Sequence, residues 1–227
     1  MTSGANYYLL TSLPPLEEPG TRPPLSTAQL RERAAHSNAA PLVDVVLLSD
    51  DLRQRQALLA GELSDVEGAV LTSGQMTGDE PLPHPLAVAE APQPPLLADD
   101  LVWDAYWRHA ARVARRRHSR FLGGWVRVEV ALRNRLVAGR ARALGESVEG
   151  REVAPELGGA DGVVEDGVAA WMGADDPLTG WRSLLMTRWR WTTSEERRFS
   201  FSRDEVAAYA VKLLLLRDWH RTMRDAA

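Results

Sequence analysis

The sequence predicts an all-α fold, and three observations support this class. Apolar residues recur at helical spacing along several long segments, and capping patterns precede two of these segments. No segment shows the alternation of apolar and polar residues that a sheet of any size needs. The widest apolar face lies on residues 125–145, WVRVEVALRNRLVAGRARALG, where two neighbouring stripes run side by side. We therefore expect a helical bundle with this segment at the centre of its core.

Composition limits the class of protein further. The chain has 227 residues, 44% of them hydrophobic, so it can bury one sizeable core or two small ones. It has no cysteine, which excludes disulfides, thiolate metal sites and a cysteine nucleophile. No apolar run approaches the roughly 18–20 residues of a membrane span, and the first ten residues lack the pattern of a secretory signal. We expect a cytoplasmic protein.

Charge is distributed unevenly along the chain. Residues 108–142 contain eleven arginines and one acid, Glu129, whereas residues 1–100 carry acids in excess. A basic surface that meets an acidic protein, or the acidic half of the same chain, is the interpretation we favour. The alternative is an arginine-rich helical protein that binds nucleic acid. Its contacts would come from Arg115, Arg116, Arg117, Arg120, Arg140 and Arg142.

The N-terminal part predicts short helices. Residues 6–16 form an apolar opening stopped by two prolines, and they fit a strand or one or two helical turns equally well. Ser26 and Gln29 form a capping box, which predicts a helix over residues 27–35. Residues 40–63 have leucines at helical spacing but include Ser49-Asp50-Asp51. We therefore expect two short helices there, or one helix broken near Ser49.

Prolines dominate the segment that follows. Six of them between residues 81 and 95 prevent a continuous helix or a central strand. The pattern indicates a mobile connector of polyproline character over about 72–95, and we prefer a passive connector to a recognition segment. The predicted organisation is a helical part at 1–71, a linker at 72–97 and a main helical part at 98–227. The two helical parts are expected to pack as one domain.

The C-terminal part predicts longer helices. One opens at Asp99-Asp100 and ends at the basic run 115–118, and the central helix follows it, with a kink expected at Gly123-Gly124. Residues 146–173 read as a glycine-rich loop with weak helix potential at 163–172. A further helix runs from Pro177 to about residue 191. The last begins after Ser202, which forms a capping box with Glu205.

No pattern in the sequence indicates catalysis. A nucleotide-binding loop of the form GxxxxGK[ST] is missing, and the five histidines show neither HExxH nor an i, i+4 pair. We expect no catalytic residues, no cofactor and no metal. The eight tryptophans lie mostly at buried helical spacing, so they predict core packing with Arg–Trp stacking rather than stacking on nucleic-acid bases.

Arg133 is unusual because it falls within an apolar stripe of the central segment. An unpaired buried guanidinium is costly, so we predict that a carboxylate contacts it. The candidates are Glu129, one helical turn earlier, and an acid on another helix.

Three segments together resemble one family. The first is Tyr7-Tyr8-Leu9-Leu10-Thr11-Ser12-Leu13-Pro14, and the second is Trp125…Glu129…Leu132-Arg133-Asn134…Arg140…Leu144-Gly145. The third is Trp189-Arg190-Trp191 followed by Phe199-Ser200-Phe201…Glu205-Val206…Ala208-Tyr209…Lys212-Leu213…Arg217…Trp219. Their order resembles a bacterial family encoded beside V-type ATPase genes, whose members are similar to the C-type subunit of V/A-type ATPases (named d in the eukaryotic enzyme).

The resemblance implies an all-helical fold like that of the C-type subunit, and a non-catalytic role. The expected partners are V/A-type ATPase subunits, because the C-type subunit links the central stalk to the membrane rotor ring in ATP-coupled ion transport. It also implies a position at the inner face of the membrane, reached through the complex. The residues we expect to serve structure or partner binding are Tyr7, Tyr8, Glu129, Arg133, Asn134, Arg140, Trp189, Trp191, Tyr209 and Lys212.

Overall fold

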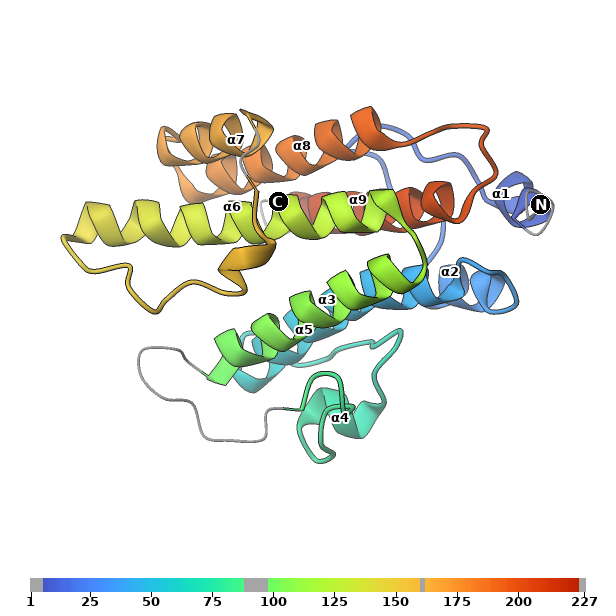
Figure 1. Ribbon diagram of the computed structural model, residues 1–227, viewed down its shortest axis with the longest axis horizontal. Helices are drawn as coiled ribbons and strands as arrows, with labels where there is room; N and C mark the ends of the chain where they lie inside the picture. Colours follow the sequence, from blue (N-terminus) through green and yellow to red (C-terminus); the bar gives the residue numbers. More distant parts are fainter. Residues whose placement is uncertain (1–5, 88–97, 160–161, 225–227) are drawn as a thin grey trace. The chain divides into compact units, whose positions relative to one another are not determined.

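The computed structural model describes residues 6–87, 98–159 and 162–224, and within these ranges the chain is helical without a β-strand (Figure 1). The predicted all-α class is confirmed. The α-helices are α1 (Tyr7–Ser12), α2 (Thr27–Ala34), α3 (Ala40–Leu59), α4 (Ser73–Thr77), α5 (Ala98–Arg116), α6 (Arg120–Leu144), α7 (Gly162–Met172), α8 (Pro177–Glu195) and α9 (Arg203–Arg224). A short 3₁₀ helix, η1, covers Pro155–Leu157.

The chain divides into two compact units. The first comprises residues 1–82, 119–121 and 192–227, and the second comprises residues 83–118 and 122–191. Helices α6 and α8 each run from the residues of one unit into those of the other. The division into 1–71, 72–97 and 98–227 stays a prediction.

The first unit is built on α3 and α9. These two helices pack against each other, α2 contacts both, and α4 contacts α3. Their facing residues are long aliphatic side chains that are almost completely buried, which is the main source of stability in a helical core. They include Leu42, Leu47, Leu52, Leu213 and Leu216.

Helix α3 is continuous, so the expected break near Ser49 is wrong. Asp50 and Asp51 are 1% and 0% exposed, and each has partners inside the unit. The Asp51 carboxylate accepts the backbone N–H groups of residues 69, 70 and 71 at 2.7–2.9 Å. Asp50 pairs with Arg217 on α9 and accepts a hydrogen bond from Gln54. Acidic residues inside a helix indicate a break only when nothing in the fold can satisfy them.

Burial raises the pKa of Asp51, and the neighbouring charge of Asp50 adds to this effect. The three backbone N–H donors act in the opposite direction and lower it. Burial has the larger effect, so the folded state favours the protonated carboxyl more than the unfolded chain does.

The expected connector from residue 72 is wrong at its start. Thr72 and Gln75 form a reciprocal capping box, and α4 follows with Met76 buried. Gly78 ends the helix in a left-handed conformation with φ 88°. Residues 88–97 lie outside the described residues, so the rest of the predicted connector stays a prediction.

The second unit contains α5, α7, η1 and most of α6 and α8. On α5 the rings of Trp103, Tyr106 and Trp107 are buried and in contact, with centroids 4.7–6.0 Å apart. On α6, Val128 and Leu132 are 2% and 0% exposed, as the predicted apolar stripe requires. Helix α7 forms over residues with only weak helix potential, and α8 continues to Glu195, four residues beyond its predicted end.

Helix α6 also runs without interruption through Gly123 and Gly124, and packing explains the second of these glycines. A Cβ atom on Gly124 would lie 3.0 Å from Cζ2 of Trp191, whereas a Cβ on Gly123 would meet its nearest neighbour, Ala114 Cβ, at 4.0 Å. The absence of a side chain at 124 therefore lets Trp191 approach the α6 backbone.

We predict opposite effects for two neighbouring substitutions. Gly124→Ala should lower the free energy of unfolding by about 1–3 kcal/mol, because its methyl group meets the Trp191 ring. Gly123→Ala should raise it by roughly 0.5–1 kcal/mol, because alanine is the better helix former and has room here. Urea unfolding monitored by circular dichroism measures both values. Equal effects of the same sign would contradict the close contact with Trp191.

Candidate functional site

Two of the polar candidates on α6 form ion pairs with other helices of the second unit. Arg133 pairs with Asp100 on α5, so the predicted carboxylate comes from another helix. Glu129 instead accepts a bidentate pair from Arg188 on α8, at 2.6 and 3.1 Å. The Glu129 and Arg188 side chains are only 12% and 16% exposed, against 21% and 31% for Asp100 and Arg133. The better buried pair is thus the one that sequence spacing did not suggest.

Asn134, the third member of the central triplet, holds a loop. Its side-chain amide donates to the carbonyl of Val153 at 2.9 Å and accepts the N–H of the same residue at 3.0 Å. Asn134 is buried, so this two-way bond replaces its contacts with water. The loop after α6 is thereby attached to the helix near its middle.

The tryptophan candidates have structural contacts. Trp191 is buried and packs on Trp125 with ring centroids 5.7 Å apart, while Trp189 is half-buried. Arg140 is exposed, and its guanidinium lies 4.8 Å from the centroid of the Trp171 ring. This agrees with the predicted core packing and Arg–Trp stacking.

Two candidates on α9 hold other parts of the first unit. The Tyr209 hydroxyl donates to the carbonyl of Pro14 at 2.8 Å, and burial raises the pKa of Tyr209 far above its usual value. Lys212 pairs with Glu196 at 2.5 Å, and both side chains are mostly buried. Tyr209 therefore joins the start of the chain to its last helix.

Tyr7 and Tyr8 on α1 are exposed, by 46% and 79%, and Tyr7 contacts the turn before α9. The Tyr7 ring contacts the ring of Phe201, with centroids 4.8 Å apart, and Asn6 donates to the Phe201 carbonyl at 3.3 Å. Phe199, two residues earlier, is 75% exposed. We call these four rings, Tyr7, Tyr8, Phe199 and Phe201, the aromatic surface.

The turn that carries Phe199 and Phe201 has an unusual backbone. Both residues have positive φ values, 61° and 48°, which bulky side chains rarely adopt and which cost about 1–3 kcal/mol each. The Glu205 carboxylate holds them by accepting both of their N–H groups, at 2.8 and 2.7 Å. Ser202 accepts the N–H of Glu205 at 3.3 Å, which is one half of the predicted capping box. In the other half the prediction differs from the structure, because the Glu205 carboxylate accepts the N–H groups of residues 199 and 201.

Sequence reasoning did not select Asn6 or Phe199 for this surface. Asn6 is 1% exposed, and its side-chain amide donates to the carbonyl of Phe201. The available signal for Phe199 was the Phe-Ser-Phe sequence directly before a capping serine. A helix can start at a capping serine without an exposed aromatic ring before it, so the ring of Phe199 indicates a role other than capping.

The arginines of the basic band perform separate tasks. Arg108, Arg133 and Arg135 pair with acids, and Arg140 lies over a tryptophan. Arg120 belongs to the first unit and Arg142 to the second. Exposed arginines lie close together at the end of α5, where Arg115, Arg116 and Arg117 are adjacent and Arg112 lies one turn earlier.

In comparisons with known proteins, no family model matches the chain, and no curated protein or solved structure matches it either. Among the described helices, none is long and apolar enough to cross a membrane. The same residues contain no group of three or more histidine, aspartate or glutamate side chains placed to hold a metal ion.

We predict that the two ion pairs of α6 differ in their effect on stability. Glu129→Gln leaves Arg188 mostly buried without its carboxylate, so the free energy of unfolding should fall by about 2–4 kcal/mol. Asp100→Asn breaks a more exposed pair and should cost about 1 kcal/mol or less. Chemical denaturation of both variants gives the two values. A larger loss of unfolding free energy for Asp100→Asn would show that the ion pair of Arg133 contributes more to stability than the ion pair of Glu129.

Proposed function

We propose that this protein is a non-catalytic component of a bacterial V/A-type ATPase, similar to its C-type subunit, and that the aromatic surface binds a partner protein of that complex. Its place is the cytoplasmic face of the membrane, between the central stalk and the membrane rotor ring. The proposal draws its family from the three-part resemblance in the sequence. The observation that carries the binding role is the exposed aromatic surface of the first unit.

Two of the three resembling segments meet at that surface. Residues 7–14 and 199–219 are far apart in sequence, yet Tyr7 contacts Phe201 and Pro14 accepts the hydroxyl of Tyr209. Tyr7 is 46% exposed and packs against Phe201, whereas Tyr8 and Phe199 are 79% and 75% exposed. The resembling segments therefore include two exposed rings, Tyr8 and Phe199, which packing of the core does not explain.

The chemistry of the surface favours a protein partner. Tyrosine and phenylalanine bury large rings at a small entropic cost, and tyrosine adds a hydroxyl for hydrogen bonding. Glu205 fixes the backbone of residues 199 and 201, so the Phe199 ring is presented by an ordered turn. Pre-organisation of this kind lowers the cost of association.

The test is co-purification from the native cells. We expect the tagged full-length chain to recover V/A-type ATPase subunits, identified by mass spectrometry. The double variant Tyr8→Ala/Phe199→Ala should recover at least about 10-fold less, because exposed aromatic anchors contribute most to binding. Leu144→Ala is the matched control, since Leu144 is 72% exposed on the other unit and should leave recovery unchanged.

Two results would contradict this proposal. Wild-type protein that recovers no component of the ATPase would remove the assigned partner. Equal recovery by the aromatic double variant would remove the assigned surface while leaving the partner in place. Circular dichroism of each variant verifies that the helices are retained.

A second candidate function rests on Arg115, Arg116 and Arg117, which are exposed and adjacent at the end of α5. Three adjacent guanidinium groups can contact nucleic-acid phosphates, and such binding weakens steeply as salt rises. A gel shift with duplex DNA and single-stranded RNA at low salt tests this function. A shift that disappears in Arg115→Gln/Arg116→Gln/Arg117→Gln would support it, and no shift for the wild type would eliminate it.

A further inference from the structure

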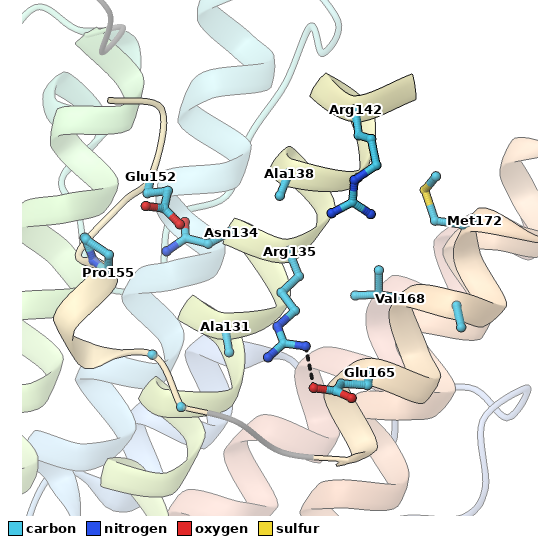
Figure 2. Close-up of a pocket in the computed structure, with 14 residues that line it drawn as sticks. Ala131, Asn134, Arg135, Ala138, Arg142, Glu152, Pro155, Glu165, Val168 and Met172 are labelled. Carbon is cyan, nitrogen blue, oxygen red and sulfur yellow. Dashed lines mark hydrogen bonds and ion pairs between the residues drawn. The ribbon is translucent and has the colours of Figure 1, made fainter. Parts of the chain in front are cut away.

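The second unit contains a pocket of about 700 Å³ between the C-terminal half of α6, helix α7 and residues 152–159 (Figure 2). This volume lies within the range of small-molecule sites in proteins. Its residues belong to the second unit alone, so the pocket shares no residue with the aromatic surface. The failure of one proposal therefore leaves the other standing.

One side of the pocket is apolar and closely packed. Ala131, Ala138, Val168 and Met172 line it. A Cβ atom on Gly139 would lie 3.2 Å from Sδ of Met172, so the absence of a side chain at 139 allows α7 to approach α6. This wall suits the hydrocarbon or aromatic body of a small molecule.

The opposite side is held in place by buried hydrogen bonds. Asn134 bonds the backbone of Val153 in both directions, and Asp104 accepts the N–H of Ala154 at 3.0 Å. These bonds attach the loop that includes Glu152 and Pro155, two further lining residues. The pocket is thus formed before any ligand arrives, which reduces the cost of binding.

Two arginines from α6 give the pocket its chemistry. Arg135 and Arg142 are seven residues apart, so they lie on the same face of the helix, about 10 Å apart along its axis. Figure 2 shows both side chains extending toward the side where α7 lies. Among the described residues, none forms a hydrogen bond or an ion pair with Arg142, which is exposed.

Glu165 is a carboxylate of the chain itself that pairs with one of these arginines. Its carboxylate lies 2.6 Å from Nη1 of Arg135, and the two side chains are 58% and 40% exposed. A pair this exposed contributes little to stability, so a competing anion can displace it. Guanidinium groups bind carboxylate and phosphate oxygens with paired hydrogen bonds, and no described residue occupies the donors of Arg142.

We propose that this pocket binds a small organic anion. Its carboxylate or phosphate group would sit on Arg142, with Arg135 as a second donor, and its apolar body would lie against Val168 and Met172. The shared chemistry is an oxyanion on a compact apolar group. Benzoate and phenyl phosphate represent its two forms.

The experiment follows the methyl resonance of Met172 in the full-length protein during titration with benzoate, phenyl phosphate and neutral benzyl alcohol. We expect one or both anions to shift this resonance with a dissociation constant of roughly 0.1–1 mM, as fragments of this size typically give. Benzyl alcohol should bind at least about 10-fold more weakly, because it lacks the charge. Met76, buried in the first unit, is the internal control and should not shift.

Three variants separate an anion site from any other pocket. Arg142→Gln should weaken binding of the anion about 10-fold or more, because it removes the guanidinium that would bind the anion. Glu165→Gln should strengthen it about 2- to 5-fold, since the internal competitor for Arg135 is removed. Arg112→Gln, on the exposed face of α5, should change nothing. A Met172 resonance that responds to neither anion, responds equally to benzyl alcohol, or responds identically in Arg142→Gln would overturn the proposal.

Discussion

Two adjacent carboxylates in the middle of α3 hold the first unit together. Asp50 pairs with Arg217 on α9, and Arg217 also donates to Thr27 on α2 at 3.4 Å. Asp51 accepts three backbone N–H groups of the segment that leads to α4. One turn of α3 is therefore bonded directly to α9 and to the segment before α4, and through Arg217 to the start of α2, in addition to the apolar packing. A buried charge that lost its partner here would cost several kcal/mol, so these bonds permit few other arrangements.

This constraint also shows where sequence patterns were sufficient and where they were not. Capping predicted the starts of α2 and α9, because Ser26 and Ser202 act within one turn of the residues that identify them. The aliphatic stripe of α6 predicted a buried helix for the same local reason. Asp50 and Asp51 suggested a break because Arg217 and the backbone N–H groups of residues 69–71 lie about 20 to 170 residues away from them in sequence. Gln54, one turn along α3, also donates to Asp50, but it does not neutralise the charge.

The structure decides between the two sources of a carboxylate that the sequence left open for Arg133. Arg133 needed a carboxylate, and spacing favoured Glu129, but Asp100 supplies it and Glu129 binds Arg188. Helix periodicity can state that a charge lies on a buried face; only the packing of other helices decides which charge faces it. Only part of the aromatic surface could be predicted from the sequence, for a similar reason. Tyr7 and Tyr8 were candidates from the sequence alone. Phe199 became a candidate only once the structure showed the turn whose backbone N–H groups Glu205 accepts.

The central functional claim is that α1 and the turn before α9 form one binding surface for a component of a V/A-type ATPase. Hydrogen–deuterium exchange of the full-length protein, with and without the purified central stalk of the ATPase, tests it most directly. We expect the stalk to slow exchange in residues 6–13 and 197–202 together, while α3 and the core of α6 remain unchanged. Unaltered exchange in both segments, or protection confined to the arginines that end α5, would contradict the claim.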